Sequence, residues 1–178
     1  MIPVHIKHRL VIQQPIKEVF AYISNLENLV EWSSSAITIR KLTSGAVQAG
    51  AMVQLASRFL GKWQNLTFEV VEYDPCRWLT IKSLSGVAPC HFSYQFESAE
   101  ERETVVSQEA MISLTEGRVV QPAHVVISAL RRSLDCDLLT LKDLLEARAC
   151  RGGQYWMTER LPAGSEAIVC AHLPGLWE

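Results

Sequence analysis

A leucine-rich stretch near the end of the chain shows the clearest pattern of hydrophobic and polar positions. Between Gln121 and Cys150, apolar residues recur at intervals of three and four, which places them on one face of an α-helix. This face consists of Ile127, Leu130, Leu134, Leu138, Leu141 and Leu145. Pro122 suits the first turn, and Gly152-Gly153 predicts the end of the helix. A helix of about 29 residues is roughly 43 Å long, so its apolar face needs a broad surface to cover it.

The beginning of the chain predicts one strand followed by two short helices. Residues 5–13 alternate apolar and polar side chains, as a half-buried strand does. Pro15 then suits the start of a helix that runs to about Ser24, with apolar residues at helical spacing. Asn25 is placed to cap a second short helix over residues 26–32. Two short helices directly after a single strand are an unusual opening, which narrows the choice of fold.

Most of the remaining chain alternates in the way that strands do, with turn residues between the segments. The predicted strands cover residues 36–42, 51–59, 63–73, 77–84, 90–97 and 103–114. Short links between successive strands favour an antiparallel sheet with one buried face. Phe92, Tyr94 and Phe96, for example, share one face of their strand. The sequence therefore predicts an α+β helix-grip fold: a curved seven-stranded antiparallel sheet wraps around the long C-terminal helix, and the two short helices lie between strands 1 and 2.

Composition and charge narrow the function classes. The chain has 178 residues, of which 48% are hydrophobic and 20% charged, as in a globular domain large enough to bury a core. We expect one domain over residues 1–150 and a C-terminal extension over residues 151–178. The net charge of −2 gives no electrostatic reason to expect nucleic acid or an anionic membrane as a partner. No apolar run reaches the roughly 18 residues of a membrane span. The N-terminus lacks the apolar core of a signal peptide, which favours a cytoplasmic protein.

The cysteines favour free thiols over a disulfide framework or a zinc site. The chain contains five cysteines, an odd number, and no two of them have CxxC spacing. Cys90 and His91 are adjacent, but no third ligand lies near them in the sequence. We therefore expect neither a metal nor a cofactor, and reduced cysteines are consistent with a cytoplasmic protein.

Several motifs resemble those of one known family. Pro15 is followed by Val-Phe-Ala-Tyr-Ile-Ser-Asn over residues 19–25, and then by Glu31-Trp32. The segment Phe-Glu-Val-Val-Glu-Tyr-Asp-Pro over residues 68–75 and the helix end over residues 141–146 match as well. In these motifs and in element order, the chain resembles the polyketide cyclase/dehydrase and lipid-transport superfamily (SRPBCC, START-like). The resemblance covers about residues 5–149 and implies the helix-grip fold.

The resemblance also implies a ligand cavity between the long helix and the concave face of the sheet, with the short helices and loops as a lid. Such a cavity binds a hydrophobic molecule, for example a lipid or a polyketide, when a few polar groups in apolar walls fix its orientation. The expected ligand-binding residues are Trp32, Val53, Leu55, Phe59, Phe68, Val70, Phe92, Tyr94, Phe96, Ile127 and Leu130. The alternative is that the same side chains fill a solid core.

Candidates for catalysis are few. Aromatic polyketide cyclases of the superfamily resemble one another in a Ser-x-Arg pair before the turn that corresponds to Asp74-Pro75; here the pair falls on Glu69 and Val71, which depart from the pattern. His124, in the first turn of the long helix, and Tyr94, a phenol between inward phenylalanines, remain as candidates for proton transfer. A capping or rim role for His124 and a protein hydrogen-bond partner for Tyr94 are the structural alternatives. Two functions stay open: binding of a hydrophobic molecule, and a polyketide-type cyclase or dehydratase reaction in the same cavity.

The last segment of the chain is too apolar for a disordered tail. Residues 151–178 contain Tyr155, Trp156 and Trp177 in addition to aliphatic side chains. The resemblance to the family ends before this extension, near Cys150. We expect the extension to pack on the body of the protein or to mediate a homodimer.

Overall fold

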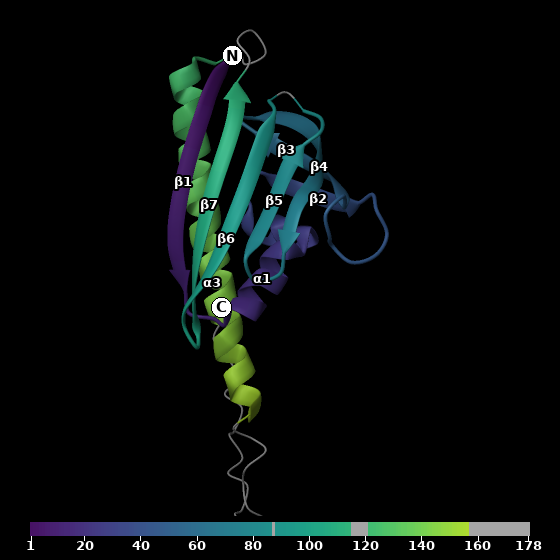
Figure 1. Cartoon of the computed structure of the whole chain (residues 1–178). Helices are drawn as coiled ribbons and strands as arrows, with labels where there is room; N and C mark the ends of the chain where they lie inside the picture. The colour runs from purple at the N-terminus through teal and green to yellow at the C-terminus, as the bar shows by residue number, and fades with distance from the viewer. Residues whose placement is uncertain (87, 115–120, 157–178) are drawn as a thin grey trace, which may run out of the picture.

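Seven strands and one long helix make up most of the structure (Figure 1). The computed structural model describes residues 1–86, 88–114 and 121–156, with side chains in the last range up to residue 148. Each predicted strand is present within three residues of its expected bounds. The strands are β1 (Ile2–Ile12), β2 (Ala36–Lys41), β3 (Met52–Phe59), β4 (Lys62–Asp74), β5 (Trp78–Ser83), β6 (Cys90–Glu100) and β7 (Glu103–Leu114).

The strands form one antiparallel sheet in the order β1-β7-β6-β5-β4-β3-β2, which confirms the predicted seven-stranded sheet. Strands β2 to β7 follow one another as hairpins, and β1 adds to the free edge of β7 with Ile2 opposite Leu114. The register shifts within the β2–β3, β4–β5 and β6–β7 pairs, and such bulges bend a sheet. The sheet curves as a result, and its inner face can take up a helix.

Helix α3 (Ala123–Trp156) lies against one face of the sheet, behind β1 and β7 in Figure 1. It begins just after Pro122, where a helix start was expected. The predicted end at Cys150 is wrong, because α3 continues through Gly152-Gly153 to Trp156. A glycine weakens a helix interior by about 1 kcal/mol relative to alanine, which disfavours the helix there without forbidding it. Residues 157–178 of the predicted C-terminal extension lie outside the described residues.

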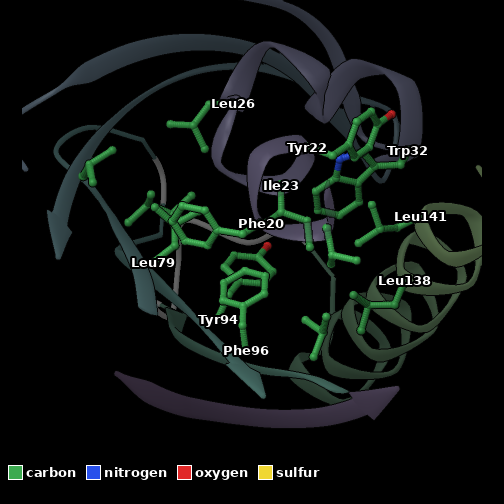
Figure 2. Packing of buried hydrophobic residues seen from close by; sticks show 14 of the residues in the cluster. Phe20, Tyr22, Ile23, Leu26, Trp32, Leu79, Tyr94, Phe96, Leu138 and Leu141 are labelled. Carbon is green, nitrogen blue, oxygen red and sulfur yellow. The ribbon is translucent and has the colours of Figure 1, made fainter. Parts of the chain in front are cut away.

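Short helical segments connect β1 to β2, as predicted. They are α1 (Ile16–Ser24), the 3-10 turn η1 (Leu26–Asn28) and α2 (Leu29–Trp32). Phe20 of α1 packs edge to face on two aromatic rings of the sheet, with centroids 5.4 Å from Tyr73 and 5.1 Å from Phe96. Figure 2 shows these helices closing one end of the space between the sheet and α3.

The leucine face of α3 has two different surroundings along its length. Leu138, Leu141 and Leu145 have exposed fractions of only 4%, 0% and 4%. They belong to the cluster that includes side chains of α1, α2 and the sheet (Figure 2). Leu130 and Leu134, nearer the N-terminus of the helix, are only partly buried. The short helices therefore fill the space beside one part of the leucine face and leave room beside the other.

Polar contacts among Tyr22, Glu31 and Arg148 connect the short helices to α3. The Tyr22 hydroxyl donates to Glu31 Oε2 at 3.0 Å, and Arg148 Nη2 donates to the same oxygen at 2.6 Å. The Arg148 guanidinium also lies 4.5 Å from the centre of the Tyr22 ring. Burial and the bond to Glu31 raise the pKa of Tyr22 to about 12. The phenol therefore stays a donor at neutral pH.

Candidate functional site

A cavity of about 370 Å³ lies between α3 and the inner face of the sheet, beside Leu130 and Leu134. Residues of β3 to β7, α2 and α3 line it. Most of the lining side chains are apolar, including Phe68 and Phe92, whose ring centroids are 6.2 Å apart. The volume falls within the range of roughly 300–1,000 Å³ that is usual for small-molecule sites.

The cavity reaches the surface between the β3–β4 hairpin and the start of α3. Leu60, Lys62 and Trp63 of the hairpin and Gln121 before α3 all belong to the lining and are exposed. At the tip of the hairpin, the φ angles of Leu60 and Gly61 are 47° and 77°. Two positive φ angles are what a tight two-residue hairpin of this kind requires. The hairpin thereby holds the Trp63 side chain beside the mouth of the cavity.

Seven of the eleven residues expected to bind a ligand belong to the lining: Trp32, Leu55, Phe59, Phe68, Phe92, Tyr94 and Leu130. The other four do not. Val53, Val70 and Phe96 are buried in the cluster around α1, and Ile127 packs against a second cluster on β1 and β7. Alternation identifies the inward face of a strand, but the position along the strand decides whether an inward residue meets the cavity or the core. Contact of the lining residues with a ligand stays a prediction.

Tyr94 and Gln108 form a buried polar pair in the cavity wall. They lie opposite each other on β6 and β7, and Gln108 Nε2 donates to the Tyr94 hydroxyl oxygen at 2.9 Å. The Tyr94 hydroxyl points into the space between the sheet and the helices (Figure 2). Burial raises the pKa of Tyr94 to about 12; the charge of Asp137 acts in the same direction, and the bond from Gln108 opposes both. The phenol therefore keeps its proton.

Protein stability should fall between about pH 10 and pH 12 because of Tyr94. Its pKa rises from 10.0 to about 12 on folding, so the folded state binds more protons than the unfolded state in this range. The contribution is complete below about pH 10 and is lost as the pH rises through 12, with a loss of roughly 1 kcal/mol at pH 11. Urea unfolding of the wild type and of Tyr94→Phe at about pH 8 and pH 11 measures how much of the free energy of unfolding each protein loses between these pH values. The same loss in both proteins would contradict the prediction.

Asp137 places a buried carboxylate in the same lining. Its exposed fraction is 4%, and it projects from α3 toward the segment after α2. There its carboxylate accepts a hydrogen bond from the Ser33 hydroxyl at 3.0 Å and another from the Ser34 backbone N–H at 2.7 Å. Asp137 therefore joins α3 to the end of α2 and also gives the cavity wall a negative charge.

Replacing Asp137 by alanine should lower the free energy of unfolding by about 1.5 kcal/mol, because the two donors on Ser33 and Ser34 lose their partner. The matched control is Asp143→Ala, which removes an exposed carboxylate from the same helix and should change stability by less than about 0.5 kcal/mol. Urea unfolding at neutral pH measures both variants. Equal effects of the two substitutions would show that the bonds to Asp137 do not stabilise the junction.

The other residues considered for catalysis are less suitably placed or charged for proton transfer or nucleophilic attack in the cavity. His124 is exposed in the first turn of α3 and is not part of the lining. Glu69 occupies the position where the aromatic polyketide cyclases have the serine of the Ser-x-Arg pair. It forms an ion pair with Lys82, with 3.5 Å between Glu69 Oε2 and Lys82 Nζ. Cys90 lines the cavity, but burial raises the pKa of its thiol, which keeps it neutral. Among the described residues, no group of three or more His, Cys, Asp or Glu side chains could hold a metal ion.

Three buried polar residues of the lining, Ser57, Gln108 and Asp137, lie outside the set predicted from the sequence. Their exposed fractions are 2%, 2% and 4%. Ser57 and Gln108 occupy inward positions of their strands, where the other inward residues are apolar except for Thr104 of β7. Asp137 comes one turn after Leu134 of the leucine face. A polar residue on the predicted buried face of a strand or helix is the signal that could have identified these three residues. Polar side chains are seldom buried without a partner or a role.

Comparisons with known proteins give the same fold. The family described as Polyketide cyclase / dehydrase and lipid transport matches residues 3–146. Among solved structures, the Zhui aromatase/cyclase from Streptomyces sp. R1128 is similar with a TM-score of 0.71 and 14% identity, over 83% of this chain and 96% of that chain. A START superfamily protein from Mycobacterium smegmatis is similar with a TM-score of 0.69 and 10% identity, over 81% of this chain and 98% of that chain. These likenesses confirm the predicted helix-grip, START-like fold.

A search of the curated proteins found no match. In the part of the chain that the structure describes, the helices are too short or too polar to cross a membrane. The fold and the cavity are therefore the observations from which a function can be argued.

Proposed function

Because this chain belongs to the polyketide cyclase/dehydrase and lipid transport family, we propose that it binds a hydrophobic small molecule in the cavity between α3 and the sheet. The ligand is a lipid, a polyketide or a molecule of similar polarity. The observation that carries the proposal is the cavity of about 370 Å³ itself, since its walls are mostly apolar and contain a few buried polar groups. This is the composition that orients a ligand in a small-molecule site.

Native mass spectrometry of the purified protein, followed by denaturing extraction, tests the proposal. We expect an additional mass that is present under native conditions and is released on denaturation, because an apolar cavity retains a hydrophobic ligand through purification. If only the mass of the polypeptide appears, addition of naphthalene, β-naphthol and naphthoate, each in excess, provides a second measurement. A protein that neither retains a ligand nor binds any of these added molecules does not have the proposed function.

A second candidate function is a cyclase or dehydratase reaction in the same cavity. The observation that favours it is the presence of a proton donor and a carboxylate in one lining, the Tyr94 hydroxyl and Asp137. The structurally similar Zhui protein is an aromatase/cyclase. In such a reaction Asp137 would accept the proton of a carbon acid, and Tyr94 would donate a proton to the carbonyl oxygen that is attacked. The departures at Glu69 and Val71 make binding without chemistry the first candidate.

The two candidate functions differ in what Tyr94→Phe and Asp137→Asn should do. An enzyme would lose product formation from the extracted ligand in both variants while the variants still bind it. A carrier would return the ligand chemically unchanged after prolonged incubation with the wild type. Mass analysis of the extracted ligand before and after incubation distinguishes these results.

Location and assembly are part of the same proposal. We place the protein in the cytoplasm, which is supported by the free thiols of Cys76, Cys90 and Cys136. We also propose that the apolar extension over residues 151–178 packs on the body of the protein or on a second copy. A chain that ends at Arg151 should lose solubility or change its oligomeric mass. If neither property changes, this role of the extension is excluded.

A further inference from the structure

The polar pair in the cavity wall has hydrogen-bonding capacity that the described residues do not use. The Tyr94 oxygen accepts the bond from Gln108 Nε2, and no described residue accepts the Tyr94 proton. Gln108 Oε1 is buried and has no hydrogen-bond partner among the described residues. Buried polar atoms nearly always have a partner. An unused donor and an unused acceptor on two paired residues of a cavity wall therefore point to a group that a ligand brings.

The chemistry of the pair restricts that group. Tyr94 O–H donates and Gln108 Oε1 accepts, so a complementary group must accept one hydrogen bond and donate another. An alcohol, an enol or a phenol does both through one oxygen. A carboxylate only accepts, and it would bring its lone pairs against those of Gln108 Oε1. A hydrocarbon would leave both groups unpaired, which is unfavourable in a buried site.

The charged side chains of the lining also disfavour an anionic ligand in the interior of the cavity. Among the described lining residues, the charged side chains are Asp137, which is buried, and Lys62, which is exposed at the mouth. The interior therefore carries negative charge, and an anion beside Tyr94 would be repelled by Asp137 at low dielectric. Lys62 attracts an anion to the mouth of the cavity instead.

We propose that the cavity selects neutral hydrophobic molecules that carry a hydroxyl group, and that this hydroxyl lies against Tyr94 and Gln108. The apolar skeleton then faces the rings of Phe68 and Phe92. This inference rests on the proposed function, because it specifies the ligand class of the same cavity. Hydrophobic acids of the same skeleton are disfavoured at the pair, and the pair determines which end of a ligand enters first.

Three probes with one skeleton test the selection: naphthalene, β-naphthol and the corresponding naphthoate anion. Their affinities are measured by fluorescence titration of the full chain at neutral pH. The main variant is Tyr94→Phe with Gln108→Met, which replaces both polar groups by apolar ones of similar size and so leaves neither half of the pair unpaired. Gln95→Met is the matched control, because Gln95 lies on the opposite face of β6 and bonds to Glu97. Thermal unfolding verifies that all variants fold.

The wild type should bind β-naphthol about tenfold more tightly than either of the other probes. The double variant should lose this preference and bind naphthalene at least as tightly as the wild type, because no buried polar group is then left unpaired. Gln95→Met should behave as the wild type. Equal binding of naphthol and naphthalene by the wild type would overturn the selection while leaving the cavity as a binding site. Binding of naphthoate by the wild type as tight as that of β-naphthol would also overturn the selection. Failure of all three probes to bind would overturn the proposed function itself.

Discussion

Replacing Leu141 by alanine is expected to lower the free energy of unfolding by about 3 kcal/mol, a large part of the stability of a domain of this size. Leu141 has an exposed fraction of 0% and lies in the cluster where α3 meets α1 and the sheet. The substitution removes apolar area from the core and leaves a void that close-packed neighbours fill only in part. Urea unfolding measures the change, and the midpoint of thermal unfolding should drop by roughly 6–12 °C.

Leu139→Ala is the matched control for this prediction. It makes the same chemical change two residues away on the same helix, but the exposed fraction of Leu139 is 61%. Its effect should stay within about 0.5 kcal/mol. If the two variants lost similar amounts of stability, the packing of α3 on the sheet described above would be wrong.

Replacing Leu130 by tryptophan is expected to weaken the binding of a neutral naphthylamine dye by roughly thirtyfold, since displacing a side chain that overfills a site costs about 1–3 kcal/mol. Leu130 lines the cavity from α3 and is only partly buried. The larger ring can therefore enter the cavity without displacing the packed core around Leu138. The thermal midpoint should stay the same or rise, because filling a cavity adds apolar contacts.

Fluorescence titration with the dye measures the effect, and Leu139→Trp controls for the added indole. That variant places the same ring on the exposed side of α3 and should bind the dye as the wild type does. Leu134→Trp, which fills the same cavity from the next turn, should reproduce the loss. Unchanged binding in both cavity variants would mean that the dye binds elsewhere.

The periodicity of the chain was sufficient to predict the elements and their exposed and buried faces. Alternation in the strands and the three-and-four spacing in α3 are local consequences of backbone geometry. The seven strands, the two short helices and the leucine face followed from them. The short links between strands indicated the antiparallel arrangement, and the family motifs agreed with it. The end of α3 was the exception, because a pair of glycines lowers helix stability by an amount that the rest of the helix can offset.

The location of the cavity was decided by tertiary structure. Leu130 and Leu141 have the same place in the sequence pattern, yet one lines the cavity and the other lies in the core. The difference arises because α1 and α2 cover only one part of α3, and their contact joins residues far apart in the sequence, such as Glu31 and Arg148. The pairing of Tyr94 with Gln108 likewise depends on the register of β6 and β7. Local patterns show which side of an element is buried, but the neighbours that meet it there are set only when distant segments pack together.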